Sequence, residues 1–431
     1  MTRSSKRALR SGIAIALVLG AITSAHAGGF AIREQSTYGQ GASYAGVAAG
    51  GSLSSMFWNP ATMTQMPGAG FELSASGILP HAANTPAAGS TLAGFGGTGN
   101  VIDDVFVPSG YGSWQLDPQF WLGLSLNVPF GLSVNFPDPW AGRNYGESSN
   151  LRSYDIEPTV AFKLNDMLSF GAGVQVQHAS AHIRRGIGVT PGVIGTLEGS
   201  GWSVGYTVGV TFTPSPNAEV GLGWRSGIDQ HIDGTLTLPP GALFSPPFST
   251  PGALKATIDL PDIVSLGVRL HFTPKWTVLE TIEFSHCGRI DTARILQPSG
   301  SPTLVGTTPV TLPFQYTDGW FYSAGVEYQL SPATALRTGV GFERSPVTDR
   351  VRMPLVPDSD RLFASLGAST ELAEGLRVDF AYSHVFLDDS HINITAASGN
   401  PWFNPLSPIA YVGNVSSHID LISLALAYRF R

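Results

Sequence analysis

The chain has 431 residues and a formal net charge of −7, and 13% of its residues are charged while 51 are glycine. An acidic chain repels a phosphate backbone, so we expect no nucleic-acid partner. The single cysteine, Cys287, excludes an intrachain disulfide, and nothing beside it in the sequence indicates a catalytic thiol.

Residues 1–27 have the three zones of a secretory signal peptide. Four basic residues precede the apolar run 13–22, and Ala25-His26-Ala27 offers small residues for cleavage. The apolar run is well short of the roughly 20 residues that a spanning helix needs. We therefore expect export and cleavage before Gly28. The segment holds four basic and no acidic residues, so cleavage lowers the net charge from −7 to −11.

The segment 28–69 precedes the first strand-like stretch and has neither a helical nor a strand period. It is rich in glycine, alanine and serine. A stretch of this length is either a periplasmic tail or a plug inside a barrel. Because small residues pack tightly in a confined lumen, we favour the plug, called the hatch below, and assign residues 70–431 to the barrel.

Apolar and polar residues alternate through the rest of the chain. Between 202 and 213 the even positions are apolar or aromatic, and the odd positions are serine, glycine and threonine. Such a strand has one face for lipid and one for water, although a soluble sandwich would show the same alternation.

The connection lengths favour a membrane barrel. We predict fourteen strands, near residues 70–80, 103–116, 120–128, 153–164, 167–185, 200–213, 218–228, 255–273, 276–287, 318–330, 334–344, 360–372, 375–388 and 417–430. Tight turns and long loops alternate between them, as in outer-membrane barrels. The predicted fold is all-β, a 14-stranded antiparallel transmembrane barrel with the hatch in its lumen.

The last strand keeps the outward pattern to Phe430. A terminal aromatic residue is what the outer-membrane assembly machinery usually reads, so we expect that machinery as a partner. Arg431 follows the aromatic residue and is a small departure from this signal.

Several motifs resemble the FadL/TodX-type family of outer-membrane transporters. The hatch carries the runs 28–36, 41–46 and Phe57-Trp58-Asn59-Pro60-Ala61-Thr62-Met63, of which Asn-Pro-Ala is the most specific, and further matches lie at 129–132, 169–171, 337–339, 345–346 and 357–361. The resemblance implies a monomeric fourteen-stranded barrel for long-chain fatty acids or aromatic hydrocarbons. It also implies that the hatch around Phe30, Asn59, Pro60 and Ala61 gates the lumen.

In that family the ligand leaves sideways, through a gap beside an inward kink of the third strand. The third segment here ends at Pro129-Phe130-Gly131. Proline cannot donate to a β-ladder and glycine weakens one, so an interrupted wall is one interpretation. The alternative is an ordinary strand end at the rim.

Fatty-acid members of the family place basic side chains near the bound carboxylate, and the positions that align with them here are Ser180 and Thr317. This departure leaves the cargo open between fatty acids and neutral aromatic hydrocarbons. Basic residues close by either substitute or form a solvated rim: His178, His182, Arg184 and Arg185.

Two long loops, 186–200 and 227–254, contain apolar stretches. The second includes Leu243, Phe244 and Phe248. Exposed apolar loops usually mark a binding surface, so we expect these residues to collect cargo, unless they bury one another.

The inward positions of the predicted strands carry charges at Arg225, Arg269, Glu327, Arg337, Glu343, Arg377 and Asp379. These charges either line a polar channel, hold the plug or neutralise one another. The chain has no nucleophile elbow, phosphate loop or His-Glu-x-x-His motif. Ser383 and His384 would point to opposite faces of a strand. We therefore expect no catalysis, no cofactor and no metal.

The sequence thus predicts a passive channel for hydrophobic small molecules in the bacterial outer membrane. The family resemblance implies long-chain fatty acids as the first candidate cargo and neutral aromatic hydrocarbons as the second. A general porin for polar solutes and a surface adhesin are the less favoured alternatives. The expected surroundings are outer-membrane lipid and lipopolysaccharide.

Overall fold

The computed structural model of the chain describes residues 29–238, 252–302, 304–305, 308–405 and 407–430. The expected signal peptide 1–27 and the loop residues Leu243, Phe244 and Phe248 lie outside this part. Among the described residues, no helix has both the length and the apolar character needed to cross a bilayer.

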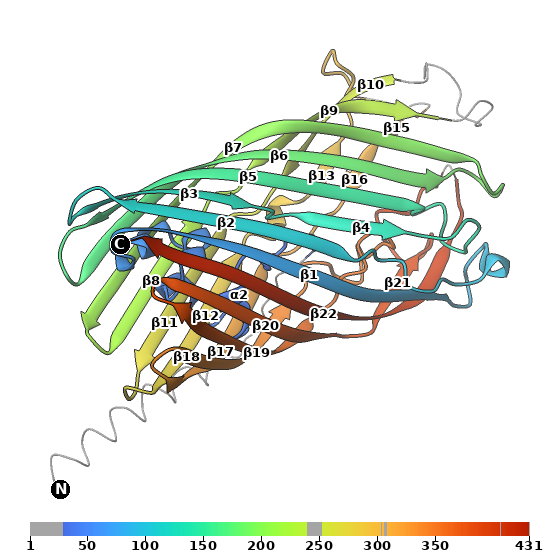
Figure 1. Ribbon diagram of the computed structural model, residues 1–431. Coiled ribbons are helices and arrows are strands. Elements are labelled where there is room, and N and C mark those ends of the chain that lie inside the picture. The colour runs from blue at the N-terminus through green and yellow to red at the C-terminus, as the bar shows by residue number, and fades with distance from the viewer. Residues whose placement is uncertain (1–28, 239–251, 303, 306–307, 406, 431) are drawn as a thin grey trace, which may run out of the picture.

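The strands form one closed antiparallel barrel (Figure 1). Its first strand, β1 (Ala69–Pro86), pairs with its last, β22 (Tyr411–Phe430), from Ala69↔Phe430 to Pro86↔Gly413. Between them come β2 (Val105–Gln115), β3 (Phe120–Asn127), β4 (Gly131–Asn135), β5 (Ser148–Lys163), β6 (Leu168–Gly186), β7 (Ile194–Ser215), β8 (Ala218–Arg225), β9 (Asp229–Thr237), β10 (Gly252–Asp259), β11 (Ile263–His271), β12 (Trp276–Ser285), β17 (Gly319–Ser331), β18 (Thr334–Arg344), β19 (Arg361–Ala373), β20 (Leu376–Leu387) and β21 (Ser390–Ile394).

These strands occupy fourteen positions, because β3 and β4, β8 and β9, β10 and β11, and β20 and β21 each share one position in the wall. All fourteen predicted strand positions are confirmed. The prediction succeeds because each strand faces lipid on one side, which imposes a period of two along the sequence.

The alternation on β7 matches the predicted faces. Trp202 and Tyr206 are 61% and 57% exposed on the outer face, whereas Thr207 and Thr211 are buried on the inner face. Apolar side chains turned outward suit contact with acyl chains.

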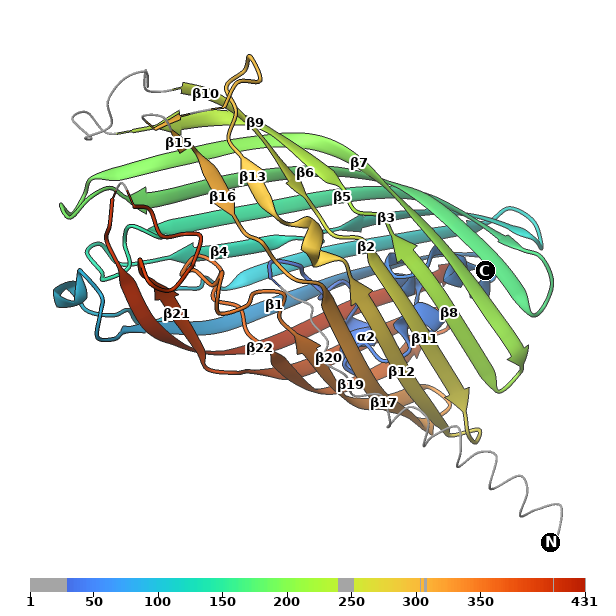
Figure 2. The ribbon, with the colours of Figure 1, turned by 180° about the vertical axis from the view of Figure 1, so that it is seen from behind.

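The two ends of the barrel differ in their connections (Figure 2). Short turns join the strands at the end where β22 terminates, and we call this the turn end. Long connections join them at the opposite loop end. They include two small hairpins, β13 (Thr292–Arg294) with β16 (Thr311–Pro313) and β14 (Leu304–Val305) with β15 (Thr308–Pro309), and the single turns η4 (Ala93–Phe95) and η5 (Cys287–Arg289).

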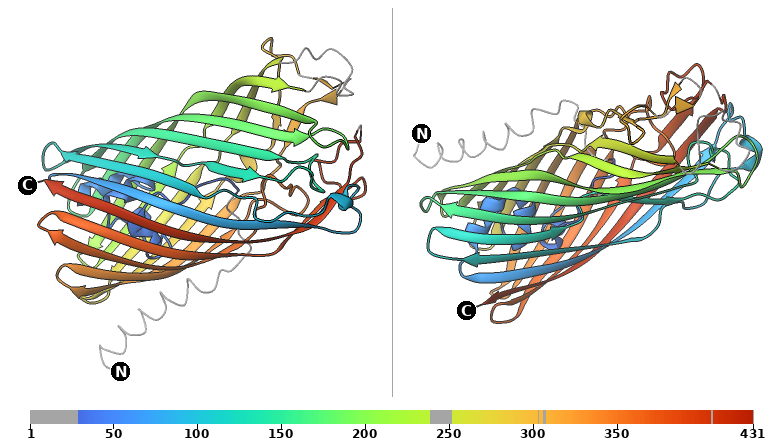
Figure 3. Two further views of the ribbon diagram at one scale, coloured as in Figure 1. Left: turned by 45° about the vertical axis from the view of Figure 1, so that its right-hand side comes forward. Right: turned by 90° about the horizontal axis from the view of Figure 1, so that it is seen from above.

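The hatch lies inside the barrel, in the half nearest the turn end (Figure 3). It contains α2 (Thr37–Gln40), η1 (Val47–Ala49), η2 (Leu53–Phe57) and η3 (Pro60–Gln65), and nearly all of its residues from Phe30 to Met63 are buried. Its backbone touches the wall where the wall has glycine. A Cβ at Gly221 would lie 1.8 Å from the Ala48 carbonyl oxygen, and one at Gly223 would lie 1.8 Å from that of Trp58. The inward glycines of the strands therefore make room for the hatch.

Candidate functional site

Asn59 ties the hatch together and to the wall. Its Nδ2 donates to the carbonyls of Ala48 at 2.8 Å and Val210 on β7 at 2.9 Å, and its Oδ1 accepts from the backbone N–H of Ala61. Pro60 follows as the first residue of η3, where its missing N–H costs nothing. The Asn-Pro-Ala motif thus combines a helix cap with a bond to the barrel.

Charged side chains join the hatch to the inner wall. Arg33 of the hatch pairs with Glu283 at 2.7 Å and Glu343 at 3.0 Å. Tyr38 donates to Glu327 at 2.7 Å. From the wall, Arg225 bonds the Phe57 carbonyl at 3.0 Å.

The inward charges also pair with one another. Arg225 binds Asp155 at 2.8 Å and Glu157 at 2.7 Å, and Arg337 binds Glu327 at 2.6 Å. The inward charges therefore both neutralise one another and hold the hatch in place, which are two of the three interpretations that the sequence left open.

The wall is interrupted between β3 and β4. Before the break, the even-numbered residues of β3 face outward: Leu124 and Leu126 are 40% and 50% exposed. Beyond the break, the even-numbered residues Phe130 and Val134 are buried inside the barrel. The side-chain parity therefore reverses across Pro129, as it does when extra residues interrupt a strand.

At this break the hatch replaces the neighbouring strand. The backbone N–H of Ile32 donates to the Pro129 carbonyl at 2.8 Å, and that of Gly131 donates to the Phe30 carbonyl at 3.0 Å. The paired part of β2 begins at Gly110↔Leu126, so residues 105–109 of β2 have no ladder to β3 or β4. Closer to the loop end the wall is joined again, because the backbone N–H of Asp103 donates to the Ser133 carbonyl at 3.1 Å. We call this gap the window.

A cavity of about 690 Å³ lies at the window. Its lining includes Phe130 and Leu421, which are buried inside the barrel, and Phe106 and Tyr154, which are 67% and 52% exposed on the outer face. The cavity is therefore lined by side chains from both the inner and the outer face of the wall, with Phe30 among them.

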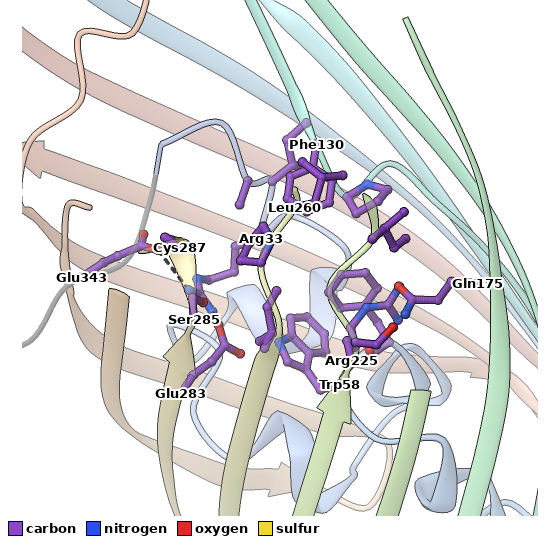
Figure 4. Close-up of a pocket in the computed structure, with 18 residues that line it drawn as sticks. Arg33, Trp58, Phe130, Gln175, Arg225, Leu260, Glu283, Ser285, Cys287 and Glu343 are labelled. Atoms are coloured by element: carbon purple, nitrogen blue, oxygen red, sulfur yellow. Dashed lines mark hydrogen bonds and ion pairs between the residues drawn. The ribbon is translucent and has the colours of Figure 1, made fainter. Parts of the chain in front are cut away.

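A smaller pocket of about 50 Å³ lies inside the barrel, next to the hatch (Figure 4). Phe130 and Leu260 lie at one end of it, and Trp58 and Glu283 lie at the other. The Arg33 and Arg225 ion pairs border this pocket. This small volume leaves no room for a bulky cargo while the hatch is in place.

Aromatic rings connect the loop end with the window. Trp402 packs edge-on against Phe314 at 5.6 Å, and Phe314 lies 5.6 Å from Tyr316. Tyr316 lies 6.5 Å from Phe30, and Phe30 lies 6.0 Å from Phe130 at the break. We call these five rings the aromatic track. Phe30 is its hatch member and separates the loop-end rings from the window.

The four residues that the sequence offered as candidates for binding a carboxylate lie in different surroundings. Ser180 and His182 face outward from β6, and His182 lies 3.2 Å from Glu198. Thr317 is exposed and donates to the Pro346 carbonyl at 3.2 Å. Arg185 faces inward and lines a separate apolar cavity at the loop end.

Sequence reasoning missed the loop members of the aromatic track. Trp402, Phe314 and Tyr316 belong to irregular segments, so no periodicity marked them. The only available signal was the density of aromatic residues in those loops. In the described part of the chain, no group of three or more His, Cys, Asp or Glu side chains is arranged to hold a metal ion.

Comparison with known proteins agrees with this architecture. The long-chain fatty acid transport protein of Escherichia coli (strain K12) is 24% identical over 430 residues, which cover 89% of this chain and 93% of that protein. The crystal structure of a Pseudomonas aeruginosa FadL homologue superposes with a TM-score of 0.82 at 20% identity, covering 94% of this chain and all of that one. The Ralstonia pickettii toluene transporter TbuX gives a TM-score of 0.66 at 14% identity, covering 93% and 100%. At these identities the two structures share the fold with this chain.

The match to a protein family extends over almost the whole sequence. The model described as outer membrane protein transport protein (OMPP1/FadL/TodX) matches residues 18–430. Together with the closed barrel, this match places the protein in the bacterial outer membrane. The chain belongs to the OMPP1/FadL/TodX family of outer-membrane transport proteins.

Proposed function

We propose that the protein is a passive channel that takes up long-chain fatty acids at its loop end and releases them sideways through the window. Its family already supports outer-membrane transport of hydrophobic compounds. Beyond the family's function, we propose which cargo is carried, which route it takes and that no energy source is coupled to transport. It also treats the chain as a monomer without enzymatic activity, surrounded by lipid and lipopolysaccharide after insertion by the assembly machinery.

The cavity at the window is the observation that carries the proposal. A cargo in the lumen meets the hatch on the turn-end side, where buried residues fill the barrel. The cavity beside Phe30 is also lined by Phe106 and Tyr154, which are exposed on the outer face, and this shared lining supports a sideways route. An apolar molecule gains free energy by entering acyl chains rather than the periplasm, so a sideways route suits apolar cargo.

The aromatic track supplies the upper part of the route. Its rings offer an apolar surface from Trp402 to Phe130, and Phe30 divides it. We propose that Phe30 acts as the gate, and that Asn59, Pro60 and Ala61 hold the rest of the hatch in place while Phe30 moves.

Neutral aromatic hydrocarbons are the second candidate cargo. The rings of the aromatic track would stack with them, and TbuX, which shares the fold, is a toluene transporter. A general porin is disfavoured, because the charges at the hatch are paired and buried residues fill the lumen there.

Uptake by a bacterial host that lacks its own transporter tests the proposal. Cells carrying the chain should accumulate radiolabelled oleate faster than cells with an empty vector. The purified protein in a planar bilayer should pass little steady ionic current. A large steady current would contradict the plugged channel, and faster uptake of toluene than of oleate would favour the second cargo.

A further inference from the structure

A second cavity, of about 260 Å³, lies at the loop end, above the window. Most of its lining is apolar and comes from strand ends and loops that are distant in the sequence, including Ile183, Leu197, Leu236, Leu312 and Trp402. We call it the outer pocket. Its wall contains one cationic side chain, Arg185 of β6.

Arg185 differs from the other inward arginines. Arg33, Arg225, Arg269 and Arg337 each form an ion pair with a carboxylate. Within the described part of the chain Arg185 has no such pair, and its buried Nε has no hydrogen-bond partner. Its guanidinium carbon lies over the face of the Trp402 ring, 4.9 Å from the ring centroid, and Tyr145 lines the same pocket.

An unpaired guanidinium in an apolar pocket is costly. Desolvation favours its neutral form, and a cation–π contact recovers only part of the lost hydration. A guanidinium stays protonated at neutral pH even when it is buried. The outer pocket therefore has an uncompensated positive charge facing apolar side chains.

The ligand that complements this arrangement has an anionic head and an apolar body. A carboxylate accepts two parallel hydrogen bonds from a guanidinium, and a hydrocarbon chain covers the leucine and isoleucine side chains. A neutral hydrocarbon would leave the guanidinium as unpaired as before. The pocket thus favours a fatty acid over toluene, although the aligned positions Ser180 and Thr317 lack a basic group.

The position of the pocket fits a first docking step. Trp402 is both the ring beneath Arg185 and the first ring of the aromatic track. A cargo whose carboxylate is held at Arg185 can lay its chain toward Phe314, which lies 5.6 Å from Trp402.

We propose that Arg185 and Trp402 form an outer docking site that selects hydrocarbon carboxylates, with Arg185 as the residue that recognises the carboxylate. This inference rests on the proposed transport function and names its selecting site. It assigns the selectivity to the loop end rather than to the two positions found by alignment.

Binding of oleate and of its uncharged methyl ester to the full-length protein in detergent tests the site. The variants are Arg185→Gln and Arg185→Lys, with Arg184→Gln as a matched control on the adjacent, outward-facing position. We expect Arg185→Gln to weaken oleate binding by about tenfold or more, the scale of a lost charge-assisted pair, with methyl oleate affected little. Arg185→Lys should retain part of the preference, and Arg184→Gln should keep all of it.

Equal losses for acid and ester in Arg185→Gln would overturn the inference, because they would mark a structural role. Unchanged oleate binding by Arg185→Gln would also overturn the inference. If the wild type still takes up oleate in cells, the transport proposal stands in either case. Failure of the wild type to take up oleate in cells would overturn the proposed function itself, and the inference with it.

Discussion

The backbone N–H of Gly131 donates to the carbonyl of Phe30 at 3.0 Å, so the hatch and the interrupted strand share a hydrogen bond at the window. Each segment satisfies backbone groups that the other leaves unpaired. We therefore expect movement of Phe30 to be coupled to the wall, which would join the proposed gate and the proposed exit in one structural unit.

Removing the ring of Phe30 should open the track. Phe30 is 7% exposed and packs against Phe130 and Tyr316, so Phe30→Ala leaves a void between the two rings. We expect faster oleate uptake and a higher ionic leak in planar bilayers. Phe170→Ala, at a ring exposed on the outer face of β6, is the control. An unchanged leak in Phe30→Ala would argue against a gate at this ring.

Asn59→Ala should loosen the hatch without unfolding the barrel. The variant loses the cap of η3, worth about 1 kcal/mol, and removes a donor from the carbonyls of Ala48 and Val210, at about 1–3 kcal/mol for each one left unsatisfied. Amide hydrogen exchange in residues 47–66 should accelerate, while exchange in the strands stays slow. Asn217→Ala, in an exposed turn, should change neither.

Arg225→Met should destabilise the protein strongly. It leaves Asp155 and Glu157 buried without their cation, a loss of about 3–5 kcal/mol for a broken buried pair. The midpoint of urea unfolding in lipid vesicles measures this effect. The exposed Arg294 offers the control, Arg294→Met, for which no shift is expected. Equal midpoints for the two variants would refute the role of this ion-pair cluster.

Glu147 should make the loop end sensitive to pH. Desolvation by burial, aided by Asp138 and opposed by Arg143, raises the pKa of its carboxyl to about 7 from an ordinary value of 4.5. Between pH 4.5 and 7 the Glu147 carboxyl keeps its proton in the folded state but has released it in the unfolded state. The contribution of Glu147 to stability is therefore greatest below pH 4.5 and is lost as the pH rises through 7. Thermal unfolding from pH 4.5 to 7 should show this decline in the wild type and a weaker one in Glu147→Gln. Parallel curves for the two proteins would contradict the assignment.

The strands could be predicted from the sequence because lipid on one side imposes a strict period. The hatch motif could be predicted through its resemblance to the family. The reversal of side-chain parity at Pro129 could not be predicted, because it depends on pairing with Phe30 and Ile32, nearly 100 residues earlier in the chain. The contacts between Trp402, Phe314 and Tyr316 join loops without any repeat. Alignment with the family pointed to Ser180 as the position of a carboxylate-binding residue. Even-numbered residues of β6, including Ser180, face outward, whereas Arg185 faces the lumen.

The most direct test of the account is to obstruct the window. Leu132 lines its cavity, so Leu132→Trp should fill part of the exit, whereas Leu124→Trp adds the same ring on the lipid-facing side of β3, below the window. The measurement is the initial rate of oleate uptake by cells that express each variant at equal surface levels. We expect a severalfold lower rate for Leu132→Trp and a wild-type rate for Leu124→Trp. A wild-type rate for Leu132→Trp would contradict release through the wall.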